Sequence, residues 1–126
     1  MGIMIALGLA AALVTPPGPQ SSGWTFYDEA DGVEVYYSVR LNADEARVAW
    51  KCVNTSGSDA SCSIGAGRNK AYRCLSNGVP VGFTEALGER ATVRAGGEYA
   101  FPSDSACRGR AITSVEPFGV RISIER

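Results

Sequence analysis

The sequence predicts an all-β chain that folds as a small, disulfide-stapled antiparallel β-sandwich of immunoglobulin-like build. Three observations support this prediction: segments in which apolar and polar residues alternate, turn residues at intervals of about 8–12 residues, and an even number of cysteines, four in all. No segment after the N-terminal apolar run sustains a helical period. A small β-barrel is the alternative architecture.

Residues 1–22 have the pattern of a signal peptide followed by a proline-rich leader. The run from Ile3 to Val14 is uncharged and apolar, and the breaker-rich segment TPPGPQSSG follows it. This run is too short to cross a bilayer of roughly 30 Å as a helix. We expect export to the periplasm or outside the cell, one domain over residues 23–126, and no stable membrane span after removal of the leader. The alternative is a buried strand or helix of the folded domain.

Residues 33–41 and 47–54 show the alternation most clearly. In each segment, apolar side chains at every second position share one face, and mainly polar or charged side chains share the other. This period of two is typical of strands that bury one face. The predicted inward positions are Val33, Val35, Tyr37, Val39 and Leu41 in the first segment, Val48, Trp50 and Cys52 in the second, and Val120, Ile122 and Ile124 near the C-terminus.

Turn signals separate the other predicted strands. Asp31-Gly32 and Asn77-Gly78 are typical of tight turns, and residues 65–69 (GAGRN) are interpreted as a further turn. Pro80 cannot donate to a neighbouring strand, so we expect its strand at a sheet edge. One helical turn is expected over residues 84–90. The remaining strand segments are 24–27, 62–64, 70–75, 79–83, 91–93, 98–101 and 111–115.

Cys52, Cys62, Cys74 and Cys107 indicate two disulfides and therefore an oxidising compartment. Four cysteines allow three pairings. We favour Cys52–Cys62 with Cys74–Cys107, because each bond then closes one loop-rich region; a hairpin that pairs Cys62 with Cys74 is the main competitor. Four thiolates could also bind zinc, but the sequence has no CxxC spacing, so no metal site is expected.

Composition argues against several function classes. The chain has no histidine, which removes the commonest general base and metal ligand, so we expect no enzymatic activity and no cofactor. The net charge is −1 and residues of both signs are interspersed, so the sequence shows no basic cluster of the kind that binds nucleic acid. Asn54-Thr55-Ser56 is a formal glycosylation sequon in a predicted surface loop, residues 55–61.

Tyr36 and Arg40 are candidate binding residues because they lie on the polar face of their predicted strand. An exposed tyrosine beside charged residues is common in surfaces that recognise proteins or carbohydrates. The alternative for Tyr36 is packing against a neighbouring strand or loop. Trp24, Trp50 and Tyr37 are expected in the core.

Two basic groups form a second candidate surface. If Cys74 pairs with Cys107, the groups would become neighbours and present a positive patch to an acidic partner or a sugar acid. The alternative is solvated arginines that discourage pairing at sheet edges. The first group contains Arg68, Lys70 and Arg73, and the second contains Arg108 and Arg110.

The sequence therefore predicts a secreted or periplasmic, non-catalytic binding module for a protein or carbohydrate ligand. One alternative is an inhibitor or toxin-like module in which the loop of residues 55–61, braced by a disulfide, inserts into the cleft of an enzyme. A small hydrolase that uses carboxylates is the second alternative.

The assignment of faces is tested with charged substitutions. Val35→Asp and Ile122→Asp are expected to prevent folding, because burying an unpaired carboxylate costs several kcal/mol. Glu34→Ala, on the opposite face, should change the free energy of unfolding by less than about 0.5 kcal/mol. Urea denaturation followed by circular dichroism measures all three variants. Equal behaviour of the three would contradict the assignment.

Overall fold

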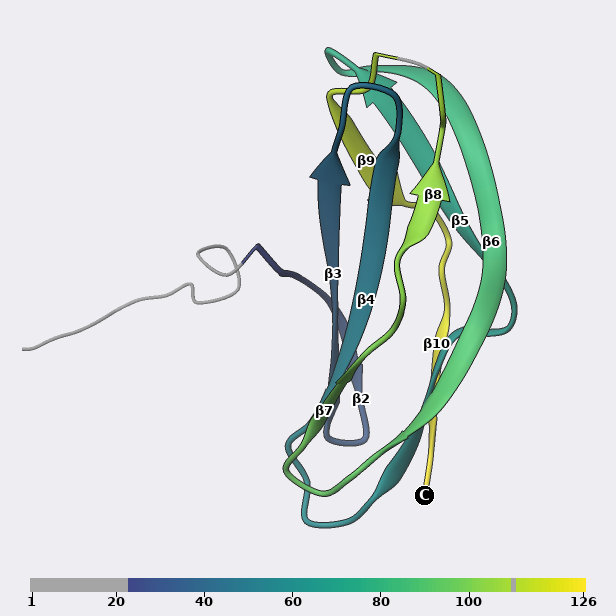
Figure 1. The fold of residues 1–126 in the computed structure, drawn as a ribbon. Coiled ribbons are helices and arrows are strands. Elements are labelled where there is room, and N and C mark those ends of the chain that lie inside the picture. The colour runs from purple at the N-terminus through teal and green to yellow at the C-terminus, as the bar shows by residue number, and fades with distance from the viewer. Residues whose placement is uncertain (1–22, 110) are drawn as a thin grey trace, which may run out of the picture.

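The computed structural model describes residues 23–109 and 111–126, so the predicted leader lies outside the described residues. The described chain forms two antiparallel sheets that pack face to face (Figure 1). The prediction of an all-β, disulfide-stapled domain is confirmed. The strand order does not by itself establish an immunoglobulin-like build.

The first sheet has the strand order β2-β3-β4-β7, and β8 also pairs with β4. β3 and β4 pair along their full lengths, with Tyr36 opposite Lys51 and Arg40 opposite Arg47. This register decides which side chains meet on the outer face. The strands are β2 (Thr25–Ala30), β3 (Val33–Leu41), β4 (Ala46–Asn54), β7 (Glu98–Ala100) and β8 (Asp104–Ala106).

The second sheet has the order β10-β5-β6, with β9 also paired to β5. β6 therefore lies at an edge, as Pro80 predicts, because proline cannot donate a ladder hydrogen bond. The strands are β5 (Ala60–Ser76), β6 (Val79–Val93), β9 (Ser114–Pro117) and β10 (Ile122–Glu125).

Two predicted turns are confirmed by their backbone angles. Asp31 and Gly32 have φ values of 48° and 78°, and Asn77 and Gly78 have φ values of 51° and 83°. Positive φ at both central residues is the requirement of the tight hairpin turn whose twist matches that of paired strands. These turns connect β2 to β3 and β5 to β6.

The turn predicted over residues 65–69 and the helical turn over 84–90 are wrong. β5 and β6 are continuous here, and the ladder shifts register between Ile64 and Asn69, so four residues of β5 bulge opposite Gly88. A Cβ on Gly88 would lie 2.3 Å from the carbonyl oxygen of Arg68, so only glycine allows this close approach.

Most of the predicted inward positions form the core between the sheets. Val33, Val35 and Val48 are fully buried with Trp50 and Cys52. Tyr37, Val39, Ile122 and Ile124 are half-buried and pack against this cluster, and Val120 is buried within it. Leu41 is the exception, since it is 45% exposed at the end of its strand.

The favoured disulfide pairing is confirmed, but its geometry differs from the hairpin expected. Cys52 in β4 bonds to Cys62 in β5, so this disulfide joins the two sheets rather than two strands of one sheet. Cys74 in β5 bonds to Cys107, which follows β8. The described residues contain no free cysteine. Two such bonds are typical of proteins that fold in an oxidising environment outside the cytosol.

Asn54 at the end of β4 is fully buried, although its sequon predicts an exposed position. Its Nδ2 donates to the carbonyl oxygens of Ser58, at 2.8 Å, and Val93, at 3.0 Å. Its Oδ1 accepts from the backbone N–H and the hydroxyl of Ser56. The side chain therefore anchors the following loop, and in the folded chain its nitrogen is occupied by these bonds.

Asn54→Asp should lower the free energy of unfolding by about 3 kcal/mol, because a carboxylate oxygen would face two carbonyl oxygens in a buried site. Asn42→Asp is the control, since Asn42 is exposed, and it should change the value by less than about 0.5 kcal/mol. Urea denaturation measures both. A loss that is equal in the two variants would contradict the anchoring role of Asn54.

Candidate binding face

The outer face of β2, β3 and β4 carries an aromatic group around one lysine. Lys51 projects outward from β4, with its Nζ 4.7 Å from the ring centre of Trp24 and 5.6 Å from that of Tyr36. Phe26, half exposed, packs edge-on against Tyr36 with ring centres 5.7 Å apart. A cation over aromatic faces is attracted by their negative charge density. We call Trp24, Phe26, Tyr36 and Lys51 the aromatic group.

Tyr36 is held by its neighbour Glu34 on the same outer face of β3. The hydroxyl of Tyr36 donates to Oε1 of Glu34 at 2.7 Å. This hydrogen bond to a carboxylate, with smaller contributions from burial and nearby negative charge, raises the pKa of Tyr36 to about 12. The hydroxyl therefore stays protonated at neutral pH, and the ring is fixed against Phe26.

A hollow of about 150 Å³ lies beside the aromatic group on the same face. It is lined by Ser38, Arg40, Arg47, Ala49 and Ser103. In the ladder, the pair Ser38–Ala49 lies between the pair Tyr36–Lys51 and the pair Arg40–Arg47. The hollow and the aromatic group therefore form one continuous surface, which we call the binding face.

The two arginines of the hollow lie directly opposite each other on adjacent strands. Arg47 is fixed, because it donates to the hydroxyl and carbonyl oxygens of Ser103 and pairs with Glu45 at 3.0 Å. Arg40 is exposed and has no ion pair among the residues that the structure describes. Like charges at facing positions repel, so an anion bound between them would be favoured.

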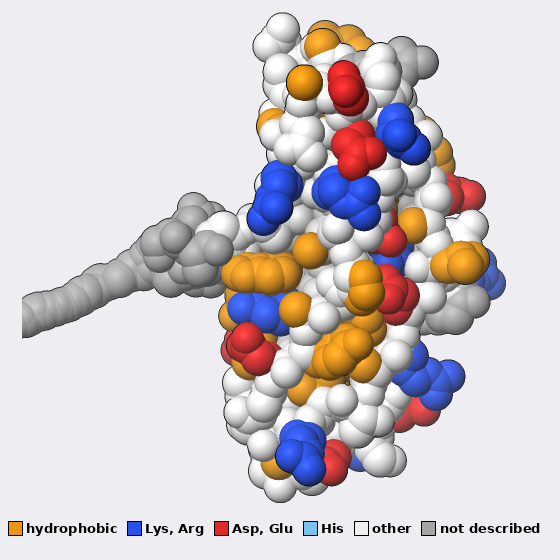
Figure 2. All heavy atoms as spheres, viewed as in Figure 1, with side chains coloured by type: hydrophobic (Ala, Val, Ile, Leu, Met, Phe, Trp, Pro, Cys, Tyr) orange, Lys and Arg blue, Asp and Glu red, His pale blue; other side chains and the backbone are white. Residues whose placement is uncertain are grey.

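Figure 2 shows this side of the molecule, where basic and hydrophobic side chains lie next to one another over β3 and β4. The prediction from sequence named Tyr36 and Arg40 as candidates, and both lie on the outer face of β3. It missed Phe26, Lys51 and Arg47, and it placed Trp24 in the core. The alternation alone could have identified Lys51 and Arg47, which lie on the outward face of β4.

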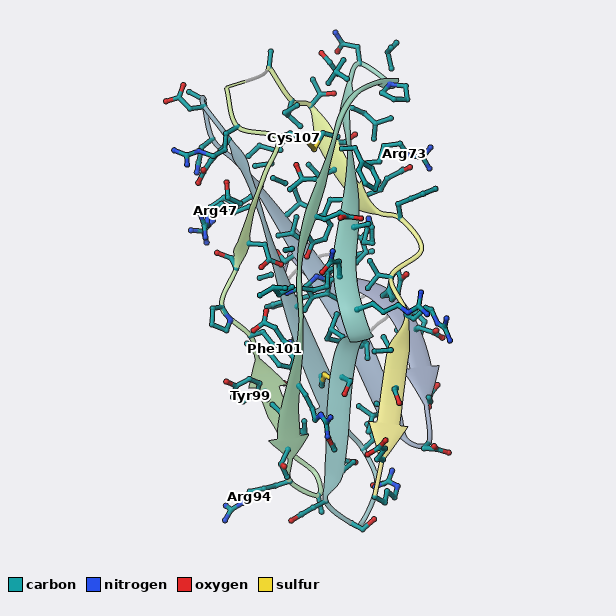
Figure 3. The ribbon with its side chains drawn as sticks, turned by 90° about the vertical axis from the view of Figure 1, so that its right-hand side faces the viewer. Arg47, Arg73, Arg94, Tyr99, Phe101 and Cys107 are labelled. Atoms are coloured by element: carbon teal, nitrogen blue, oxygen red, sulfur yellow. A yellow bond between two sulfur atoms is a disulfide. The ribbon has the colours of Figure 1, made fainter. Side chains whose placement is uncertain are left out.

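The two basic groups predicted from the sequence do not form one patch. Arg73 lies on the outer face of the second sheet, where it pairs with Glu116 at 3.1 Å. Arg108 is exposed and lies 3.4 Å from Glu45, which belongs to the first sheet's side of the molecule. Arg47 contacts the same Glu45. Figure 3 shows Arg47 and Arg73 projecting to opposite sides of the molecule. Arg68 is exposed in the β5 bulge, and Arg110 lies outside the described residues.

Lys70 is not a surface residue, which corrects its place in the predicted patch. Its side chain is 1% exposed and lies between the sheets, with Nζ 2.6 Å from Oε2 of Glu89 and 2.8 Å from Oδ2 of Asp104. It points inward because it shares a strand face with Tyr72 and Cys74, both fully buried.

A chain of hydrogen bonds continues from this ion cluster through the core. The hydroxyl of Tyr72 donates to Oδ2 of Asp104 at 2.6 Å and accepts from Nε1 of Trp50 at 2.7 Å. Burial, and then the bond to Asp104, raise the pKa of Tyr72 strongly, so its hydroxyl remains a donor. We call Lys70, Glu89, Asp104, Tyr72 and Trp50 the core polar chain.

The opposite sheet exposes a smaller aromatic surface. Phe83 and Phe118 pack edge-on with ring centres 6.0 Å apart, and the guanidinium of Arg73 lies 4.6 Å from the centre of the Phe118 ring. These three residues line a hollow of about 190 Å³. Arg73 is paired with Glu116, as Arg47 is with Glu45 and Lys51 is with Glu98 at 3.8 Å. Among the described residues, the binding face therefore differs from this surface by the unpaired Arg40.

Comparison with known proteins gives no match: no family model, curated protein or solved structure matches this chain. Within residues 23–109 and 111–126, no helix is long and apolar enough to span a membrane. The same part of the chain contains no group of three side chains that could hold a metal ion.

The pKa of Tyr36 tests the arrangement of the binding face. In the native chain this ring should ionise at about pH 12. Because the folded pKa exceeds the unfolded value of 10.0, the small stabilisation from this solvent-screened bond to Glu34 is complete below pH 10.0 and is lost as the pH rises through about 12. Glu34→Gln should bring the pKa back toward 10.0. NMR titration with labelled tyrosine measures it, and an unchanged pKa in the variant would contradict the contact.

Proposed function

We propose that this protein is a secreted binding module that holds an acidic polysaccharide, a polymer of uronic acid units, on the outer face of β2, β3 and β4. The observation that supports this proposal best is the facing pair of Arg40 and Arg47 beside the aromatic group. The binding face offers, side by side, the two kinds of contact that such a polymer requires.

Aromatic rings supply the first kind of contact. The apolar faces of sugar rings stack on aromatic side chains, and tyrosine and tryptophan provide large contact areas with few rotatable bonds. Tyr36 is held by Glu34 and Phe26, and Trp24 is held by the ammonium of Lys51. A ring that is already positioned loses little conformational entropy when a ligand binds.

The arginines supply the second kind of contact. A guanidinium forms paired hydrogen bonds with a carboxylate, and an ionised partner makes these bonds stronger than neutral ones. Arg47 is held in place by Ser103, while Arg40 is unpaired among the described residues. A uronate carboxylate between them would relieve their repulsion.

The shape of the site also suits a polymer. The hollow is small, at about 150 Å³, and lies along the strands, in line with the aromatic group. Small-molecule sites are usually deep clefts that bury most of their ligand. A surface that continues along two paired strands instead allows a chain to extend beyond the residues that hold it.

Polygalacturonate and neutral dextran are the probes, and isothermal titration calorimetry measures binding of the full mature chain. Polygalacturonate should bind and dextran should not. Arg40→Gln should weaken binding about tenfold, since one charge-assisted hydrogen bond contributes about 1.5 kcal/mol. Tyr36→Ala should weaken it by a similar factor through lost stacking.

The matched controls lie on the second sheet. Arg121 and Phe83 are exposed there, so Arg121→Gln and Phe83→Ala remove the same charge and a similar aromatic ring without touching the binding face. Both should bind as the native chain does. Equal affinity for dextran, no binding to polygalacturonate, or equal losses in the controls would each overturn the proposal.

A further inference from the structure

The ion cluster at the centre of the core polar chain brings an amine and a carboxyl group into contact across the two sheets. Nζ of Lys70, on β5, lies 2.8 Å from Oδ2 of Asp104, on β8. Oε2 of Glu89, on β6, lies 2.6 Å from the same Nζ. The lysine side chain is 1% exposed, whereas those of Asp104 and Glu89 are 17% and 28% exposed.

Such a contact holds the amine nitrogen beside the carboxyl group that it would attack. Groups held at a separation of about 3–3.5 Å react far faster than the same groups free in solution. The burial of Lys70 also penalises its charge, and joining amine and carboxyl as an amide would remove one positive and one negative charge from the core. The partial exposure of Asp104 leaves a route by which a released water molecule can depart.

We propose that Lys70 and Asp104 condense to form an intramolecular amide bond between Nζ and Cγ, with loss of one water molecule. The ammonium of Lys70 first gives a proton to Asp104, and the free amine attacks Cγ of the neutral carboxyl group. The nitrogen–carbon bond forms as the carbonyl becomes tetrahedral, and Glu89 takes a second proton from the nitrogen. The hydroxyl of Asp104 then takes this proton from Glu89 and leaves as water. No oxidant or other reactant is required, and Glu89 is regenerated.

Each neighbour has a defined role in this step. Glu89 is the general acid and base, because it contacts the nitrogen that loses protons. The hydroxyl of Tyr72 donates to Oδ2 of Asp104 and stabilises the negative charge that grows there. Trp50 positions that hydroxyl by donating to it. Burial and the Asp104 contact keep the pKa of Tyr72 high, so the donor retains its proton.

The amide would be a third covalent connection of β5. The strand already bonds through Cys62 to β4 and through Cys74 to the segment after β8. Lys70 lies between these two cysteines in the sequence. The amide would therefore join β5 to β8 from a third position along β5. Unlike the disulfides, this connection would persist under reducing conditions.

Mass spectrometry of the full mature chain, purified after export and then reduced and alkylated, tests the proposal. The intact mass should be lower by one water molecule than the mass expected for the mature sequence. Trypsin should fail to cleave after Lys70 and should release a branched peptide in which residues 69–73 are joined to residues 95–108. An intact mass without this loss, in protein whose two disulfides had formed, would overturn the proposal.

Two variants separate the chemistry from folding. Lys70→Arg keeps the positive charge but cannot form this amide, so it should show the full mass while retaining both disulfides. Glu89→Gln keeps the size of the side chain but removes the base, so the fraction condensed at a given time should fall at least tenfold. A Glu89→Gln chain that condensed as fast as the native chain would overturn the role of Glu89.

Discussion

The packing of the two sheets depends on one hydrogen-bonded group, the hydroxyl of Tyr72. It lies in the second sheet and contacts Trp50 and Asp104, which both belong to the first sheet. Buried polar groups without partners cost far more than paired ones gain, so the alignment that satisfies the indole, the hydroxyl and the carboxylate together is favoured over alignments that separate them. The disulfide between Cys52 and Cys62 then holds the sheets in this alignment.

The binding face is a consequence of the same alignment. Side chains alternate along a strand, so the inward positions of Trp50 and Cys52 require Lys51 to project outward. In the same way, the inward positions of Val35 and Tyr37 require Tyr36 to project outward. The pairing of β3 with β4 then places these outward side chains opposite each other. The candidate surface therefore consists of the residues that the core does not use.

Much of the fold could be predicted from local patterns, because alternation and turn residues are properties of neighbouring positions. The faces of β3 and β4 and the turns at Gly32 and Gly78 were found in this way. The disulfide pairing was favoured because each bond closes a loop-rich region, although Cys52 and Cys62 join the two sheets. The bulge opposite Gly88 was not predicted, since it depends on a contact with Arg68 in another strand.

The sequence predicted the site only in part, because contacts between distant segments decide the rest. Tyr36 and Arg40 follow from the alternation, whereas the position of Trp24 depends on the packing of Lys51 from β4. Lys70 was predicted at the surface because it is charged, although the inward face it shares with Cys74 was visible in the sequence. Its partners Glu89 and Asp104 come from distant segments and could be found only from the assembled sheets. The most direct test of this account is the free energy of unfolding of Tyr72→Phe, measured in urea beside Tyr99→Phe, whose ring is 42% exposed. The account predicts a loss of about 1–3 kcal/mol for the first variant and less than about 0.5 kcal/mol for the second, whereas equal stability of the two would contradict it.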